Sequence, residues 1–147
     1  MNKKNIIIFP TALFVVLLDQ LTKFLIKTKF QLAESIPIVK NMLHFTYVTN
    51  TGSAFGLFKG LDLFFVIFSF VVIVAILYFM KNIKQNEKLM QVSFGLLLGG
   101  TIGNLADRIL FGHVIDFIDF RIWPVFNVAD SAITVSIALL VILLWKK

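Results

Sequence analysis

Three aspartates, Asp116, Asp119 and Asp130, stand close together beside a long apolar run. The chain has only eight acidic residues, so this grouping points to chemistry. Two carboxyl groups held close together cannot both ionise easily, and one of them therefore keeps a proton. The ionised partner can then take a proton from water, while the protonated partner polarises a carbonyl group and later protonates a leaving amine. This chemistry hydrolyses peptide bonds, and the spacing leaves open whether Asp116 or Asp119 pairs with Asp130.

The composition is that of a membrane protein. Of the 147 residues, 59% are hydrophobic and 15% are charged, and the mean hydropathy is +0.91. A soluble domain of this length has too little interior to bury so much apolar surface, so we expect lipid to be its main solvent. We expect residues 1–147 to form a single membrane-embedded domain.

The charges and the lack of cysteine exclude several classes of function. The net charge is +6, but the basic residues lie between apolar runs rather than in a patch with interleaved aromatic residues, so we expect no nucleic-acid partner. The chain has no cysteine, which excludes disulfides, thiolate catalysis and cysteine-ligated metals. Its two histidines, His44 and His113, are far apart in the sequence, so we expect no metal site.

Four apolar runs have about the length of 20 residues that a helix needs to cross the hydrocarbon core of a bilayer. They cover residues 6–25, 61–80, 89–109 and 126–145. In the third run, Gly95, Gly99 and Gly103 recur at every fourth residue and leave one helical face almost bare, which favours close packing against another helix. We therefore expect a mainly α membrane protein with four transmembrane helices.

The segment 31–60 is different, because it mixes polar and apolar residues and contains Pro37 and three glycines. Leu43, Phe45 and Tyr47 recur at every second residue, a period that predicts a β-strand. We expect a turn at residues 51–53 and a return strand at 54–58. Since an open sheet edge is not stable in lipid, this β element should lie at or above the interface, between the first two spans.

The lysines predict the orientation in the membrane. Lysines near both ends of the chain and in the 81–88 loop fall on one side of a four-span protein. By the positive-inside rule this side is cytoplasmic, so both termini are cytoplasmic. The opposite side also carries Lys27, Lys29, Lys40 and Lys59, which makes the asymmetry incomplete.

The polar residues of the four spans converge at their outer ends, and Asp116 and Asp119 are expected in the outer loop that follows the third span. The converging residues are Asp19, Lys23, Asn104, Asp107, Arg108, Asp116, Asp119, Asn127 and Asp130. Charged side chains at this depth are energetically expensive, so they indicate a functional site.

Several of these residues also have simpler structural roles open to them. Asp19 and Lys23 are one helical turn apart and could form only an ion pair. Arg108 could extend to the lipid headgroups as an anchor. Asn127 could cap the fourth helix, with Asp130 completing a capping box, and Asn50 could serve only a turn.

Two other functions suit a small four-helix membrane protein. A proton-coupled transporter usually needs an acid near the bilayer midplane, facing a cavity, whereas the acids here cluster near one face. A structural or pore-forming protein would leave the acid cluster unexplained. A membrane aspartyl endopeptidase is therefore the preferred hypothesis, with the transporter as the alternative.

Five sequence blocks, in order, resemble those of lipoprotein signal peptidase, the type II signal peptidase of bacteria, over almost the full chain. The blocks are Asp19–Lys23, Asn50–Phe55, Gly103–Arg108, Val114–Phe117 and Phe126–Ser131. Two positions depart from the family pattern, since Ser53 stands where Ala is usual and Ser136 where Gly is common.

The resemblance implies that Asp116 and Asp130 are the catalytic dyad. It implies that the enzyme cuts prolipoproteins just before a cysteine that carries diacylglycerol, and that the segment around Asn50 is an extracytoplasmic β-cradle resting on the membrane. The residues expected to bind substrate or to support the dyad are Asp19, Lys23, Asn50, Asn104, Asp107, Arg108, Asn127 and Ala129.

The same resemblance implies a multi-pass protein of the bacterial cytoplasmic (inner) membrane with its active site at the outer leaflet. Globomycin is the expected inhibitor, and neither a metal nor an organic cofactor is implied. The basic residues of the outer side would favour anionic membrane phospholipids as partners.

Overall fold

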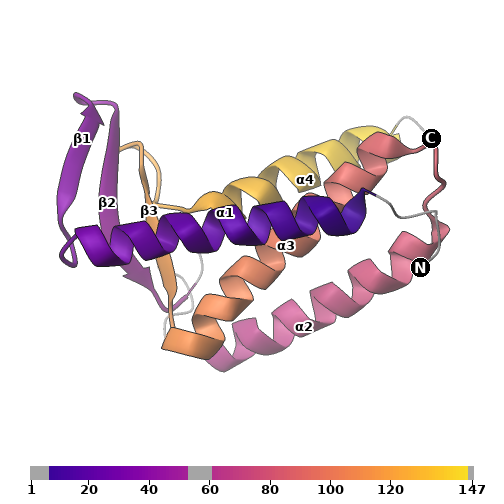
Figure 1. Cartoon of the computed structure of the whole chain (residues 1–147), viewed down its shortest axis with the longest axis horizontal. Coiled ribbons are helices and arrows are strands. Elements are labelled where there is room, and N and C mark those ends of the chain that lie inside the picture. The colour runs from indigo at the N-terminus through magenta and orange to yellow at the C-terminus, as the bar shows by residue number, and fades with distance from the viewer. Residues whose placement is uncertain (1–6, 53–60, 146–147) are drawn as a thin grey trace.

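Residues 7–52 and 61–145 are the part of the chain that the computed structural model describes, and they form four long helices with a small sheet at one end (Figure 1). The helices are α1 (Ile8–Lys29), α2 (Asp62–Phe79), α3 (Lys88–Phe111) and α4 (Val128–Trp145), and a short 3₁₀ helix, η3 (Met80–Asn82), follows α2. All four long helices have the length and composition to cross a membrane. The predicted four-helix fold is confirmed.

Helix α3 is the centre of the bundle, because 61% of its apolar stretch is buried, against 28% for α1 and 17% for both α2 and α4. Glycine permits this packing. A Cβ atom at Gly99 would lie 2.6 Å from the backbone oxygen of Ala12 in α1, and one at Gly100 would lie 2.6 Å from the backbone oxygen of Ala129 in α4. The close helix packing predicted from the glycine spacing is confirmed.

The helix bounds differ from the predicted spans by a few residues. Helix α1 continues to Lys29, and α3 continues to Phe111, where Gly112 ends it with a left-handed φ of +71°. Helix α4 begins two residues later than predicted, because Phe126 pairs with Ile118 in a β-bridge. The aspartates and asparagines near the helix ends are thus held by regular backbone.

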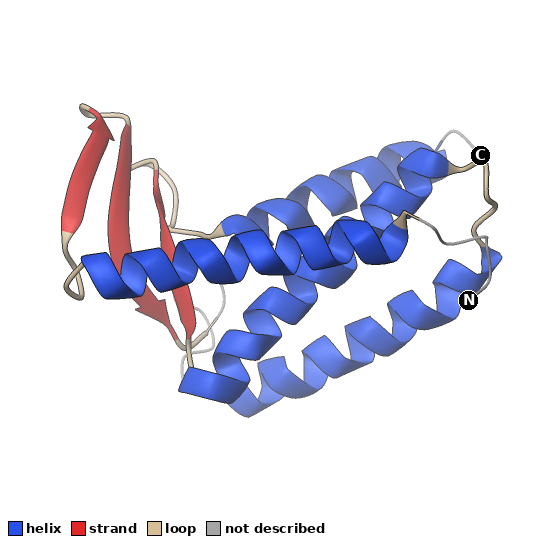
Figure 2. Cartoon of the chain, in the orientation of Figure 1, coloured by secondary structure: helices blue, strands red, loops and turns tan. Residues whose placement is uncertain are grey.

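The sheet, red in Figure 2, is antiparallel with the order β1-β2-β3, and its strands are β1 (Ser35–Val39), β2 (Leu43–Asn50) and β3 (Val114–Asp119). Strand β2 confirms the strand predicted around Leu43–Tyr47, while the return strand predicted at 54–58 lies outside the described residues. Strand β3 corrects the prediction of a loop after the third span. It was missed because it is largely buried and lacks the polar–apolar alternation of a half-exposed strand.

The side chains of β3 alternate between two sides of the sheet. Val114 and Asp116 line a large cavity among the helices, whereas Ile115 lines a smaller one beside α1. Asp119 is three residues from Asp116, so the two aspartates point to opposite sides. The topology of β3 therefore allows only one of them to face the large cavity.

Strand β2 reaches both aspartates because its register shifts within residues 45–48, where a β-bulge offsets the alternation of side chains. Thr46 lies within the shifted region and binds Asp119, while Asn50 lies after it and binds Asp116. The bulge lets one strand support two sites on opposite faces of the sheet.

The outward faces of the helices are apolar, with large exposed side chains such as Phe14, Leu63 and Ile142. The first turn of α1 and the last turn of α4 lie at the end of the bundle opposite to the sheet (Figure 1). The sheet and the buried polar side chains thus lie at one end of the bundle, and the helices between the two ends present an apolar surface that suits lipid.

Candidate active site

Asp116 of β3 and Asp130 in the first turn of α4 line the same cavity of about 940 Å³. Asp116 is 2% exposed, and Asp130 is half-buried. Asp119, the other candidate from the sequence, does not line this cavity. The structure therefore brings Asp116, rather than Asp119, beside Asp130.

Asn127 links the two aspartates. Its side-chain nitrogen donates to Asp116 Oδ1 at 2.7 Å, and its Oδ1 accepts the backbone N–H of Asp130 at 2.9 Å. The backbone N–H of Asn127 donates in return to Asp130 Oδ2 at 3.3 Å. This reciprocal pattern is a capping box, so the expected cap is present, and it also fixes the position of Asp116 relative to Asp130.

Two further asparagines hold the outer oxygens of the pair. Asn50 Nδ2 donates to Asp116 Oδ2 at 3.0 Å, and Asn104 Nδ2 donates to Asp130 Oδ1 at 2.8 Å. Asn50 Oδ1 also accepts the backbone N–H of Gly52 at 2.9 Å, so Asn50 serves both the turn and the site. Each carboxyl group is therefore oriented by neutral amide donors.

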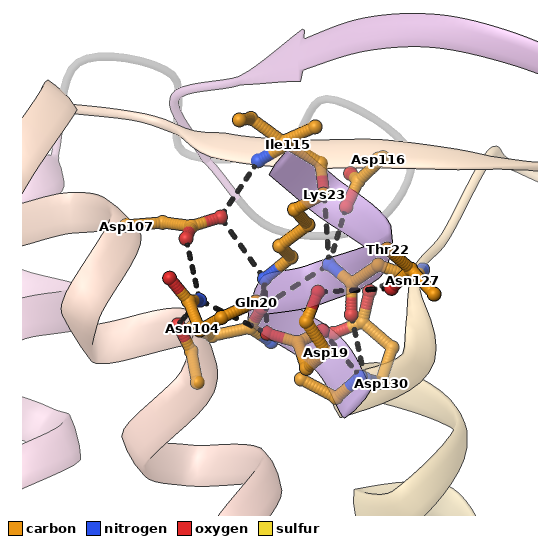
Figure 3. Close-up of polar contacts among 12 residues, drawn as sticks. Asp19, Gln20, Thr22, Lys23, Asn104, Asp107, Ile115, Asp116, Asn127 and Asp130 are labelled. Atoms are coloured by element: carbon orange, nitrogen blue, oxygen red, sulfur yellow. Dashed lines mark hydrogen bonds and ion pairs between the residues drawn. The ribbon is translucent and has the colours of Figure 1, made fainter. Parts of the chain in front are cut away.

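The buried ammonium of Lys23 lies beside Asn104, and Lys23 is 2% exposed (Figure 3). Its Nζ atom is 2.8 Å from Asp19 Oδ2, 2.9 Å from Asp107 Oδ2 and 3.0 Å from Asn104 Oδ1. An ammonium group has three protons, so this geometry satisfies all of them. The expected ion pair of Asp19 and Lys23 is present, but it belongs to a larger cluster that reaches the dyad through Asn104.

The two aspartates of this cluster each hold one of the segments that carry the dyad. Asp19 Oδ1 accepts the backbone N–H of Ala129 at 2.9 Å, at the start of α4. Asp107 Oδ2 accepts the backbone N–H of Ile115 at 3.0 Å, in β3. Ala129 thus contributes through its backbone, and Asp107 is buried in the protein rather than exposed at the interface.

Gln20 is a member of the site that the sequence analysis left without a role. Its Nε2 atom donates to Asp107 Oδ1 at 2.9 Å and to the backbone oxygen of Gly103 at 3.2 Å. It also lies 3.2 Å from Asp19 Oδ2. Gln20 stands next to Asp19 in the first sequence block, and this adjacency is the signal that could have identified it.

Arg108 lines the cavity rather than anchoring the protein to headgroups. Its guanidinium group donates to the backbone oxygens of Gly52 at 3.3 Å and Asn104 at 3.4 Å, and it lies 5.0 Å from the ring centre of Phe65. These contacts join the turn after β2 and helix α2 to α3, beside the cavity that Asp116 and Asp130 line.

The surroundings of Asp116 favour the protonated form. Burial and the negative charge of Asp130 raise the pKa of Asp116 to about 7, against the hydrogen bonds from Asn50 and Asn127, which lower it. A carboxyl group with this pKa is available as both acid and base near neutral pH. Within residues 7–52 and 61–145, no group of three or more His, Cys, Asp or Glu side chains is arranged to hold a metal ion.

The family model described as signal peptidase (SPase) II matches residues 11–146. A lipoprotein signal peptidase of Halothermothrix orenii is 45% identical over 141 residues, which cover 95% of this chain and 96% of the relative. A lipoprotein signal peptidase of Moorella thermoacetica is 44% identical over 135 residues, covering 92% and 88%. One of Staphylococcus aureus is 40% identical over 139 residues, covering 92% and 85%.

Two solved structures, both described as bacterial membrane enzymes, are also similar to this chain. One has a TM-score of 0.92 at 38% identity and covers 99% of this chain and 93% of the solved one. The other has a TM-score of 0.89 at 38% identity, covering 100% and 99%. Because the family model and the relatives span nearly the whole chain, this chain belongs to the signal peptidase II family of membrane peptidases that process lipoproteins.

Proposed function

We propose that this protein is an aspartic endopeptidase that removes signal peptides from prolipoproteins by cleaving before the diacylglyceryl-modified cysteine, with Asp116 and Asp130 as its catalytic dyad. The observation that carries the proposal is the pair of aspartates that share Asn127 and line one cavity. Membership of the signal peptidase II family supports the substrate class.

In the proposed mechanism, the dyad holds one proton when substrate binds. The ionised carboxylate takes a proton from water, whose oxygen attacks the carbonyl carbon before the lipidated cysteine. The protonated carboxyl group donates a hydrogen bond to the carbonyl oxygen and stabilises the charge that develops there. The C–N bond then breaks as the leaving amine of the cysteine takes a proton from the dyad.

The shape of the cavity suits a substrate with a lipid anchor. From the dyad it extends between apolar side chains of α2, α3 and α4, including Phe68, Leu97 and Ile137. A diacylglyceryl group held in the membrane would keep the scissile bond at the depth of the dyad, which removes much of the entropic cost of encounter. Unlipidated precursors lack this anchor and should react poorly.

We also propose an orientation with both termini in the cytoplasm and the dyad at the outer leaflet of the cytoplasmic membrane. The lysines Lys81, Lys84 and Lys88 support it, because they lie in and beside the α2–α3 connection, at the end of the bundle opposite to the sheet (Figure 1). In this orientation the sheet would rest on the outer surface as a β-cradle, in contact with phospholipid headgroups.

The described residues do not favour the alternative of a proton-coupled transporter, since Asp116 lies in the sheet and Asp130 lies in the first turn of α4 rather than at mid-helix. Figure 3 shows both side chains in one cluster with Asp19 and Asp107. Globomycin, the inhibitor expected from the family resemblance, would occupy the cavity beside the dyad. Its binding should therefore compete with substrate.

The test is cleavage of a prolipoprotein by the purified protein in detergent or lipid. We expect the wild type to cut only the diacylglyceryl-modified precursor, mass spectrometry to identify the new N-terminus as the lipidated cysteine, and globomycin to inhibit the reaction competitively. The Asp116→Asn variant, prepared in the same way, is the blank. Equal cleavage of lipidated and unlipidated precursor, or cleavage at another bond, would contradict the proposal.

A further inference from the structure

The loop between β3 and α4, residues 120–127, forms one wall of the cavity that contains the dyad. Trp123, Pro124, Val125 and Phe126 all line this cavity. The loop also connects the strand that carries Asp116 to the helix that carries Asp130. Its conformation therefore affects the shape of the cavity that Asp116 and Asp130 line.

Asp119, the last residue of β3, binds the start of this loop. Its Oδ1 accepts the backbone N–H of Arg121 at 2.7 Å, and its Oδ2 accepts a guanidinium N–H of Arg121 at 3.2 Å. Arg121 has a φ of +67°, in the left-handed region that side chains disfavour. A carboxylate that binds the backbone two residues ahead stabilises such a turn.

The end of the loop is held by backbone hydrogen bonds. The Ile118 N–H donates to the Phe126 oxygen at 2.7 Å, and the Phe126 N–H donates to the Ile118 oxygen at 3.1 Å. The rings of Phe120 and Phe126 stack, with centroids 5.9 Å apart. The side chain of Asp119 is thus what fixes the beginning of a loop whose end is fixed by its own backbone.

A chain of hydrogen bonds across the sheet supplies Asp119 with a third donor. Thr46 Oγ1 donates its single proton to Asp119 Oδ2 at 2.8 Å, so it must accept the proton of Ser35, 2.8 Å away. Ser35 must then accept a proton from His44 Nδ1 at 3.2 Å. Protons are thus donated from His44 through Ser35 and Thr46, and the chain must end on an acceptor, which is Asp119. Burial raises the pKa of Asp119, but the hydrogen bonds from Thr46 and Arg121 outweigh it and lower this pKa.

We propose that Asp119 is a positioning residue that keeps the β3–α4 loop in the shape that binds the lipidated substrate, whereas Asp116, on the other face of the same strand, takes part in the chemistry. The inference rests on the proposed function. Two of the three hydrogen bonds of Asp119 go to the loop and one goes to the sheet. Because the loop lines the cavity, loss of these bonds should change the affinity for substrate rather than the chemistry.

The test compares kcat and KM of Asp119→Ala, Asp119→Asn and Thr46→Val on lipidated prolipoprotein. Loss of charge-assisted hydrogen bonds should raise KM about tenfold in Asp119→Ala, with kcat nearly unchanged. Asparagine keeps an oxygen for the Arg121 N–H, so Asp119→Asn should recover part of the affinity. Thr46→Val removes only the bond to the sheet and should change KM less. An effect of Thr46→Val as large as that of Asp119→Ala, or a loss confined to kcat, would overturn the proposal.

A second readout does not depend on cleavage. The chain has two tryptophans, so in a Trp145→Phe background Trp123 of the loop is the one fluorescent tryptophan. We expect Asp119→Ala to change acrylamide quenching of Trp123 and Thr46→Val to change it less. Unchanged quenching with Asp119→Ala would overturn the role of Asp119. A wild type that cuts no lipidated precursor would instead overturn the proposed function, while quenching would still decide whether Asp119 holds the loop.

Discussion

Two pairs of aspartates at the sheet end of the bundle have opposite surroundings. Asp19 and Asp107 flank the ammonium of Lys23 at 2.8 and 2.9 Å. Asp116 and Asp130 accept hydrogen bonds from neutral asparagine amides, and neither forms an ion pair within the described parts of the chain. Asp19 and Asp107 are thus paired with a buried cation, whereas a site built from neutral donors and a second acid leaves room for a proton. The comparison separates aspartates that hold segments in place from aspartates that can exchange a proton.

The largest effect should come from the pair that exchanges the proton. We expect Asp116→Asn and Asp130→Asn each to lower kcat by about 10²–10⁴-fold or more, the usual contribution of a general acid or base. Asparagine has nearly the same size and can still bond to Asn127, so both variants should fold. The control is Glu34→Gln, an acid-to-amide change at an exposed position of the sheet end. Dyad variants that cleave as fast as this control would break the comparison.

The pair that holds the fold should respond in stability. We expect Lys23→Met to lower the free energy of unfolding by about 3–5 kcal/mol, because it leaves two buried carboxylates without their cation. Lys27→Met is the matched control on the next turn of α1, where the side chain is exposed and its ammonium lies 3.7 Å from the centre of the Phe111 ring. Thermal unfolding in detergent measures both. Equal melting temperatures for the two variants would show that the cluster does not stabilise the fold.

A methyl group placed against Asp19 tests the connection between the two pairs. A Cβ atom at Gly103 would lie 2.6 Å from Asp19 Oδ2, and one at Gly95 would lie 2.6 Å from the Cβ atom of Thr11. Overpacking of this kind costs about 1–3 kcal/mol, so we expect both Gly103→Ala and Gly95→Ala to lower stability. Gly103→Ala should also lower kcat, since Asp19 holds the backbone of Ala129 beside the dyad. Equal kcat values for the two variants would argue against this connection.

The smallest effect is a shift along the pH axis. The pKa of Asp116 is raised to about 7 by burial and the charge of Asp130, so the dyad loses its proton, and kcat falls, as the pH rises through this value. The hydrogen bond from Asn50 favours the carboxylate, so Asn50→Ala should raise this pKa further and move the alkaline limb of the profile to higher pH. Thr46→Val, which alters the opposite face of β3, should leave the limb in place. A limb that moves to lower pH with Asn50→Ala would contradict this account.

The sequence predicts the helices well because the requirement for long apolar runs in lipid is strict. It also predicts that Asp19, Lys23 and Asn104 lie at a common depth, and the structure brings their side chains into contact. The close packing at the glycines of α3 was predicted because few residues other than glycine fit where two helix backbones approach closely.

Strand β3 and the choice between Asp116 and Asp119 depend on information that spacing alone does not contain. The strand is buried on both sides, so its pattern does not alternate, and without the strand the opposite directions of the two aspartates are not apparent. The bulge in β2 changes which face Asn50 reaches. Gln20 also had no distinctive pattern, because its role depends on the approach of α3.

Infrared spectroscopy of the detergent-solubilised protein with isotope-labelled aspartate tests the central distinction most directly, because the carbonyl stretch of a protonated carboxyl group is separate from that of a carboxylate. We expect one protonated aspartate below neutral pH, lost as the pH rises through about 7 and absent from Asp116→Asn. The control Asp119→Asn should keep the signal. A wild type without this signal, or an Asp116→Asn variant that retains it unchanged, would contradict the assignment of the shared proton to the dyad.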